Sequence, residues 1–274
     1  MEMNSFSILS LNTFGVPFYL SFWRIKQLAA ELIRLAPSVI CLQEIQQNAY
    51  LPLLQIGLKD YPTRVYYRNR FAPKGGVFTA SAAGCPIARS AFIPFPNRGV
   101  PLSIGFADWA LNKGVLLADL EIRGLRVIVM NTHLQANYFS DWQPSNRQTQ
   151  IQLAQVKTLA ETARAQPEDA WVFVCGDFNF PRRSPAYEQM LAHSGLTDAL
   201  ANDTRPTYQP FPLASSKWQI PLDYCFYRMP AGKAGRVKAD ILPIENSRAR
   251  WPFQRFLTDH HALILYIESV QSSK

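Results

Sequence analysis

Polar side chains that could bind a cation or move a proton stand at the edges of six apolar runs in this 274-residue chain. A buried carboxylate is unfavourable unless it is paired or binds a cation. Several polar residues at the edges of apolar runs therefore indicate a functional site. Four carboxylates, two amides and two histidines hold such positions: Asn12, Glu44, His133, Asp177, Asn179, Asp223, Asp259 and His260. This oxygen-rich set suits Mg²⁺, Mn²⁺ or Ca²⁺ better than zinc.

The most specific of these stretches is VFVCGDFNF at 172–180. Its apolar run breaks at Gly176, and an acid and an amide, Asp177 and Asn179, follow two positions apart. A strand that ends in this way is difficult to explain by packing alone, because both polar groups would be partly buried. We therefore interpret this stretch as part of a site.

Taken singly, the other residues have simpler explanations. Asn12 fits a turn, Glu44 fits the first turn of a helix over 46–58, His133 fits a core histidine, and Asp223 fits a loop cap. The simpler explanations require six independent coincidences, so one shared site is the better interpretation of the set.

The elements that must position these residues follow from the hydrophobic pattern. Apolar runs rich in β-branched and aromatic residues predict strands over 6–12, 38–44, 75–81, 114–122, 125–134, 171–177, 221–227 and 261–267. Helical periodicity predicts helices over 21–37, 146–166 and 184–195. A turn at Arg123-Gly124 makes 112–134 a hairpin, so we expect mixed sheets and not a barrel of alternating strands and helices.

Two of the predicted helices carry an apolar face. Ile25, Leu28, Leu32 and Leu35 share one face of the first helix. Ile151, Ala154 and Leu159 share one face of the second, with polar residues elsewhere.

Composition indicates one folded domain over residues 1–274. Hydrophobic residues make up 48% and charged residues 18%, which allows a large core, and neither a linker nor a repeat interrupts the chain. The net charge of +8 favours an anionic partner, with nucleic acid, a phosphorylated small molecule and an acidic bilayer all open. The N-terminus does not resemble a signal peptide, and no stretch is long and apolar enough to span a membrane. We expect a cytoplasmic monomer, with peripheral membrane contact as an open option.

The four cysteines, Cys41, Cys85, Cys175 and Cys225, lack the spacing of a metal or redox pair. Three of them lie in predicted strands, so we expect buried free thiols.

The ordered series SLN, LQE, NTHL, GDFN, LDY and TDHHAL resembles the endonuclease/exonuclease/phosphatase superfamily of metal-dependent phosphoesterases. Within it, ADWALNKGVL at 107–116 and NTHLQANY at 131–138 are similar to the neutral sphingomyelinase branch. The chain departs from that branch at TASAAGCPI and IPLDY. The resemblance implies a four-layer α/β sandwich, with two mixed β-sheets packed face to face and helices outside. It also implies that Asp108 and Lys113 act as a switch that controls access to the site.

The expected activity is Mg²⁺-dependent hydrolysis of a phosphodiester by in-line attack of water, with Mn²⁺ as a substitute. A phospholipid such as sphingomyelin is the expected substrate. The alternatives are a metal-dependent endonuclease or exonuclease on DNA or RNA, a phosphomonoesterase of the same superfamily, and a binding module without catalysis.

Each polar residue then has an expected role. Glu44 is the first metal ligand, with Asn12 beside it and Asp259 as a further contributor. His260 is the general base, and Asp223 fixes its tautomer. Asp177 orients the attacking water or shares the role of base, and Asn12 also belongs to the catalytic set. Asn179 and His133 donate hydrogen bonds to the non-bridging phosphate oxygens.

Overall fold

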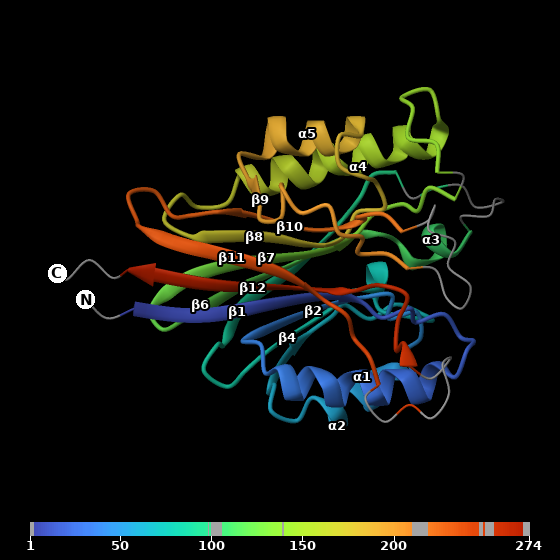
Figure 1. The fold of residues 1–274 in the computed structure, drawn as a ribbon, viewed down its shortest axis with the longest axis horizontal. Helices are drawn as coiled ribbons and strands as arrows, with labels where there is room; N and C mark the ends of the chain where they lie inside the picture. Colours follow the sequence, from blue (N-terminus) through green and yellow to red (C-terminus); the bar gives the residue numbers. More distant parts are fainter. Residues whose placement is uncertain are drawn as a thin grey trace.

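Two six-stranded β-sheets form the centre of the computed structural model (Figure 1). It describes residues 3–97, 99, 106–138, 140–209, 219–246, 249 and 255–270, without the side chains of 3, 106–108 and 270. The first sheet has the order β11-β12-β1-β2-β4-β3, and the second has the order β5-β6-β7-β8-β10-β9.

The first sheet contains β1 (Met3–Asn12), β2 (Val39–Gln43), β3 (Thr63–Val65), β4 (Phe78–Ser81), β11 (Gly235–Leu242) and β12 (Ala262–Val270). The second contains β5 (Ile87–Pro94), β6 (Gly114–Ile122), β7 (Leu125–His133), β8 (Trp171–Asp177), β9 (Thr197–Asp198) and β10 (Asp223–Arg228). The helices are α1 (Ser21–Leu35), α2 (Tyr50–Gly57), α3 (Phe106–Leu111), α4 (Arg147–Arg164) and α5 (Pro185–Ser194), with a 3₁₀ turn η1 (Lys74–Gly76).

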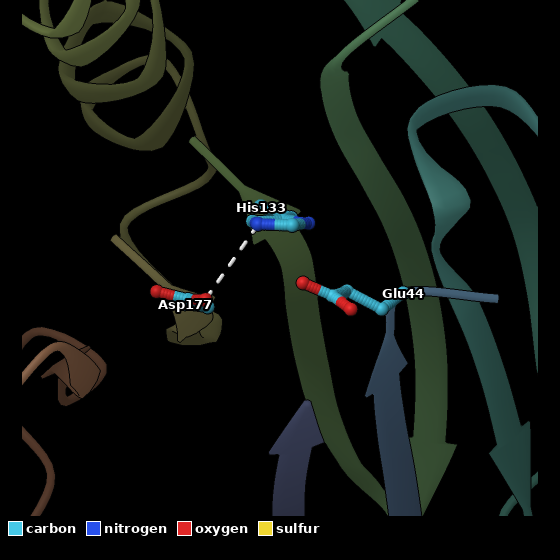
Figure 2. A group of neighbouring side chains, drawn as sticks. All are labelled: Glu44, His133 and Asp177. Carbon is cyan, nitrogen blue, oxygen red and sulfur yellow. Dashed lines mark ion pairs between the residues drawn. The ribbon is translucent and has the colours of Figure 1, made fainter. Parts of the chain in front are cut away.

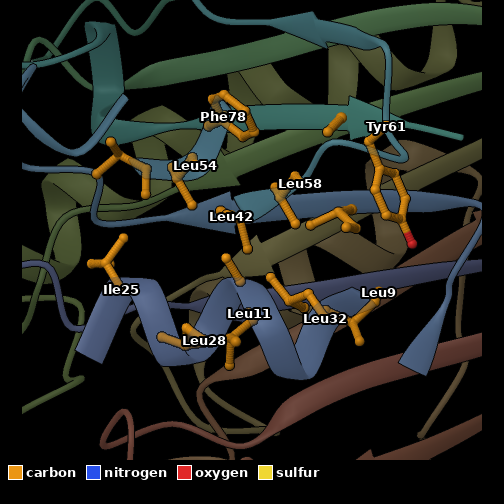
Figure 3. Packing of buried hydrophobic residues seen from close by; sticks show 14 of the residues in the cluster. Leu9, Leu11, Ile25, Leu28, Leu32, Leu42, Leu54, Leu58, Tyr61 and Phe78 are labelled. Atoms are coloured by element: carbon orange, nitrogen blue, oxygen red, sulfur yellow. The ribbon is translucent and has the colours of Figure 1, made fainter. Parts of the chain in front are cut away.

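Three hydrophobic clusters separate four layers. One lies between the first sheet and the helices α1 and α2, where Leu11, Leu28 and Leu42 pack together (Figure 3). A second lies between the two sheets, and a third lies between the second sheet and α4 and α5. The predicted four-layer sandwich of two mixed sheets is therefore confirmed. Cys41, Cys175 and Cys225 belong to the cluster between the sheets, and all four cysteines are buried free thiols, as predicted.

The predicted strands are all present, with ends shifted by a few residues, but four further strands are not predicted by the hydrophobic pattern. These are β3, β5, β9 and β11, and they occupy the four edges of the two sheets. Edge strands face water along one side, so their sequences mix charged and apolar residues. β11 shows this mixture, since exposed and half-buried residues alternate along most of GRVKADIL.

The apolar face predicted for α1 is largely correct, because Ile25, Leu28 and Leu32 are buried. The face predicted for α4 is partly correct, since Leu159 is buried as predicted. Ile151 and Ala154 are only half-buried, whereas Gln152 and Gln155 lie in the buried stripe beside Val156 and Leu159.

Gln152 and Gln155 are buried because their side chains form hydrogen bonds to the backbone of nearby loops. The Gln152 amide donates to the carbonyl oxygens of Gln135 and Asn179, each at 2.8 Å. The Gln155 oxygen accepts from the Gln135 N–H at 2.9 Å. Polar residues thus occupy core positions of α4 and obscure the hydrophobic period.

Strand direction brings the predicted site residues to one end of both sheets. β1 and β2 run parallel, and so do β7 and β8, so each pair ends at the same edge. β12 runs antiparallel to β1 and β10 runs antiparallel to β8, so these two strands begin at that edge. Asn12 is the last residue of β1, and Asp223 is the first residue of β10.

A buried amide pair ties the two sheets together beneath this edge. Gln43 of β2 donates to Asn131 Oδ1 of β7 at 2.7 Å. The Asn131 amide donates in turn to the carbonyl oxygens of Leu42 at 3.1 Å and Phe78 at 3.0 Å. Both side chains of the pair are fully buried, so these bonds have no competition from water.

The tie predicts a stability effect. Asn131→Ala leaves two buried carbonyl groups and the Gln43 amide without these partners, so the free energy of unfolding falls by about 2–4 kcal/mol. Urea denaturation measures the change, with Asn202→Ala, at an exposed position, as the control. A loss as small as that of the control would show that the tie does not stabilise the fold.

Candidate active site

A cavity of about 360 Å³ opens where the strand ends of the two sheets meet. Its lining includes Glu44, His133, Asp177, Asn179, Asp259 and His260. Asn12 and Asp223 stand behind this wall and bond to its side chains. The structure therefore brings together all eight polar residues that the sequence predicts at strand ends.

Asp177 is at the centre of the group. Its Oδ2 accepts a hydrogen bond from the Asn12 amide at 2.9 Å, and the same amide lies 3.2 Å from Glu44 Oε1. Figure 2 shows Glu44 and Asp177 facing the same space, with His133 beside them; His133 Nε2 lies 3.6 Å from Asp177 Oδ2. Asn12 thus links two carboxylates that come from different sheets.

His260 is held by carboxylates on several sides. Its Nδ1 lies 2.8 Å from Asp223 Oδ2, and its Nε2 lies 3.8 Å from Asp177 Oδ2 and 3.9 Å from Asp259 Oδ1. Burial by itself would lower the pKa of His260, but the charges of Asp223 and Asp177 raise it well above its usual value. The contact with Asp223 fixes Nδ1 as the protonated nitrogen, which leaves Nε2 toward the cavity.

His133 has the opposite electrostatic environment. Burial and the nearby positive charges of Lys113 and His260 lower its pKa well below the usual value. A histidine in this state is neutral and carries one ring N–H. Its Nδ1 has no hydrogen-bond partner among the described residues, so the simpler interpretation as a satisfied core histidine does not fit.

The acids are arranged in a way that suits a cation. Desolvation raises the pKa of Glu44, raises that of Asp177 to about 6 and raises that of Asp259 to about 7. Asp259 Oδ1 is buried and has no hydrogen-bond partner among the described residues. Carboxylates that are costly to ionise and incompletely paired fit a divalent ion that binds oxygen ligands.

Two groups of three potential ligand atoms, each within 4.8 Å of one another, are present in the described part of the chain. One is Glu44, His133 and Asp177, and the other is Asp177, Asp223 and His260. Asp259 belongs to neither group. Asn12 directs its amide nitrogen toward the acids and accepts from the Phe14 N–H with its oxygen, so in this orientation it bridges carboxylates.

The backbone at Glu44 is adapted to this position. Glu44 has a left-handed φ of 57°, which is unusual for a residue other than glycine and is characteristic of functional sites. A Cβ on Gly15 would overlap the Glu44 carbonyl oxygen, so only glycine fits there. Helix α2 begins at Tyr50, so Glu44 is not its first-turn acid.

Asn179 and Lys113 lie close together at the Leu134 carbonyl. Asn179 donates to it at 3.1 Å and Lys113 Nζ at 2.5 Å, and Lys113 is fully buried. The carbonyl takes one of the two amide hydrogens of Asn179, and the residue also lines the cavity. Asp108 lies in α3, but its side chain is outside the described residues, so the access switch stays a prediction.

Sequence reasoning did not identify Tyr208 and Gln46 as site residues. The Tyr208 ring packs on the His260 ring with centroids 5.0 Å apart, and burial raises the pKa of its phenol to about 12. The Gln46 amide donates to Glu44 Oε2 at 3.2 Å. Both lie in irregular loops, where no periodicity marks a residue as facing a site.

Comparison with known proteins gives consistent matches. A model of the Endonuclease/Exonuclease/phosphatase family matches residues 9–260. The chain is 27% identical over 206 residues to a putative neutral sphingomyelinase of Drosophila melanogaster, covering 74% of this chain and 45% of that protein. It is 26% identical over 196 residues to an inositol phosphosphingolipids phospholipase C of Schizosaccharomyces pombe, covering 70% and 45%. The chain spans about half the length of the curated relatives it matches.

Solved structures share the fold. Sphingomyelinase C from Streptomyces griseocarneus superposes with a TM-score of 0.71 at 24% identity, covering 96% of this chain and 99% of that one. D. rerio TDP2, complexed with a single-strand DNA product, gives 0.73 at 20% identity, covering 96% and 98%.

The acid cluster predicts a metal-dependent stability change. Mg²⁺ in large excess over its dissociation constant stabilises the native protein by about 2–4 kcal/mol, which raises Tm by several degrees. Glu44→Gln abolishes this shift, and it raises Tm without metal because it removes a carboxylate that is costly to ionise in the fold. Differential scanning calorimetry measures both effects, and Glu121→Gln, at an exposed position, retains the Mg²⁺ shift. An equal shift in wild type and Glu44→Gln would place the metal elsewhere.

Proposed function

The chain belongs to the Endonuclease/Exonuclease/phosphatase family, as its motif order predicts, and from this we propose that it is a metal-dependent phosphoric diester hydrolase. The observation that carries the proposal is the shared cavity, in which acids, two imidazoles and an amide from both sheets face one space. A non-catalytic binding module would not require a histidine held by Asp223 and facing Asp177.

Within the group of Glu44, His133 and Asp177, the two carboxylates, which Asn12 bridges, would hold Mg²⁺ or Mn²⁺. Asp259 stays a predicted contributor, supported by its Oδ1, which accepts no hydrogen bond from the described residues. When bound, the ion would neutralise charge on a phosphate oxygen and lower the pKa of water.

A bound divalent cation would offset the acids that raise the pKa of His260, and the neutral ring would then take a proton from the attacking water at Nε2. Asp223 holds the Nδ1–H, which fixes the tautomer and stabilises the imidazolium that forms. Asp177, 3.8 Å from Nε2, orients the same water. The new phosphorus–oxygen bond forms opposite the one that breaks, and the leaving oxygen is protonated from water.

Two donors face the phosphate. Neutral His133 offers a ring N–H, and Asn179 has an amide hydrogen that does not bind Leu134. Donors of this kind stabilise the charge that develops on the non-bridging oxygens, and loss of one costs about 10²–10³ in rate.

The proposed substrate is the phosphodiester of a phospholipid such as sphingomyelin. The support comes from the curated relatives, a putative neutral sphingomyelinase and an inositol phosphosphingolipids phospholipase C. A cavity of about 360 Å³ is of a size to take a headgroup. No helix among the described residues is long and apolar enough to cross a membrane. A cytoplasmic location, a monomeric state and a single domain over 1–274 stay predictions.

A nuclease is the second candidate, and the net charge of +8 favours it. Arg68 and Arg70 are exposed and lie on one loop, where they could follow a phosphate backbone.

The proposed roles predict the effect of two substitutions. His260→Ala and Asp177→Ala each lower kcat/KM on bis-p-nitrophenyl phosphate by about 10²–10⁴-fold, because each removes a group that acts on the water. Steady-state hydrolysis in Mg²⁺ measures the loss, and EDTA abolishes the wild-type activity. His193→Ala and Asp169→Ala, at exposed positions, are the matched controls. Near-wild-type turnover by either site variant would refute its role.

A substrate panel separates the two candidates. We expect hydrolysis of sphingomyelin in mixed micelles to exceed that of plasmid and single-stranded DNA by about tenfold or more in kcat/KM. Salt gives a second criterion, since binding to DNA weakens steeply with added NaCl and binding to a zwitterionic headgroup does not. Preferred cleavage of DNA with a steep salt dependence would establish the nuclease.

A further inference from the structure

Large apolar side chains are exposed at the turn between β1 and α1 and at the start of α1. Phe18, Tyr19, Leu20 and Phe22 are 68%, 58%, 63% and 50% exposed, although they stand within five consecutive positions. Seven large apolar residues in the described part of the chain are at least 50% exposed, and four of them lie here. Single exposed apolar residues need no explanation, but a contiguous group marks an interaction surface.

Hydrogen bonds fix the backbone of the turn between β1 and α1, and this keeps its apolar side chains at the surface. The Arg24 guanidinium is buried and donates to the carbonyl oxygens of Tyr19 at 2.8 Å, Thr13 at 3.2 Å and Phe14 at 2.6 Å. It also donates to Leu257 O at 2.9 Å, on the loop that leads to Asp259. Because Arg24 binds all four of these carbonyl groups, it fixes the turn between β1 and α1 relative to the loop before Asp259.

Backbone conformation supports the same conclusion. Tyr19 and Leu20 have left-handed φ values of 52° and 57°, which is costly for non-glycine residues and indicates a specified conformation. Leu20 precedes α1 without capping it through a side-chain hydrogen bond. The Leu20 side chain therefore does not stabilise the start of α1 by capping it, and capping does not explain why it is exposed.

The exposed turn is continuous with the candidate active site. Phe14 and Val16, from the same segment, line the cavity that contains Glu44 and His260. In Figure 1 the chain leaves β1 and enters α1 at the end of the molecule where the strand ends converge. Whatever binds the turn is therefore brought beside the cavity mouth.

A second loop adds one apolar side chain and positive charge. Phe71 is 72% exposed, and Arg70 lies over its ring at 5.1 Å. The Phe71 carbonyl accepts from the Asn48 N–H at 2.8 Å, and two residues further on the Tyr50 ring packs on Phe22 at 5.1 Å.

The two loops thus adjoin one another through residues 48–50. We call Phe18, Tyr19, Leu20, Phe22 and Phe71 the apolar rim. Lys26, Arg68 and Arg70 beside it are exposed cations.

We propose that the apolar rim is a docking surface for a lipid bilayer that contains anionic lipid, which it contacts while the cavity takes a headgroup. Apolar side chains enter the interface between headgroups and acyl chains, and the flanking cations meet the negative surface. The combination of projecting apolar tips and adjacent cations fits a bilayer better than a protein, whose interface core is depleted of charge. The proposal rests on the proposed phosphodiesterase function, because it explains how a substrate held in a membrane reaches the site.

The test measures binding to vesicles without turnover. Phe18→Ser combined with Leu20→Asn removes two apolar tips, and asparagine tolerates the left-handed backbone of position 20. In EDTA, we expect wild type to sediment with phosphatidylcholine vesicles that contain phosphatidylserine, and the double variant to bind about tenfold or more weakly. Ile56→Ser, which alters another apolar side chain that is 76% exposed, binds like wild type. Phe71→Ser, on the other loop, provides a second and independent rim variant.

Hydrolysis of soluble bis-p-nitrophenyl phosphate separates docking from catalysis. The rim variants retain this activity within about twofold, which also shows that they are folded. Wild type that does not bind vesicles, or rim variants that bind as well as wild type, would overturn the docking surface and leave the proposed chemistry intact. Wild type that binds vesicles but does not hydrolyse phosphodiesters would refute the proposed function alone.

Discussion

The cost of burying carboxylates is the constraint on which the site depends. Glu44, Asp177 and Asp259 are held where desolvation raises the pKa of each, and a fold does not accept this cost without a compensating charge. His260 compensates part of it, since its pKa is raised by Asp223, Asp177 and Asp259. A divalent cation would compensate the rest. The three carboxylates that destabilise the metal-free fold are therefore the same groups that are proposed to act on a phosphodiester.

Sheet topology solves the problem of bringing these groups together. Two parallel strand pairs, one in each sheet, end at the same edge, and two antiparallel strands begin there. The Gln43–Asn131 bond ties the sheets directly beneath Glu44. Arg24 then fixes the turn after β1 to the loop before His260 through backbone carbonyls alone. The Gln43–Asn131 bond thus holds the base of the site. The Arg24 hydrogen bonds hold the turn from which the apolar rim projects.

The fold and the central site residues were predictable because both leave local signals. Strands buried on both faces read as continuous apolar runs, and a polar residue that ends such a run, as Asp177 does, stands out. The edge strands were not predictable, because strands that face water on one side do not form the continuous apolar runs that mark buried strands. The buried face of α4 was obscured because Gln152 and Gln155 use core positions to bind loop backbone. Tyr208 and Arg24 act through contacts with residues that are distant along the chain, which sequence spacing does not reveal.

Anomalous diffraction from crystals grown with Mn²⁺ is the most direct test of the central claim, which is that these acids share one divalent cation. The account predicts a single strong peak in the cavity, at coordination distance from Glu44, that disappears in crystals of Glu44→Gln. A map without a peak in this cavity, or a peak that persists in Glu44→Gln, would contradict it.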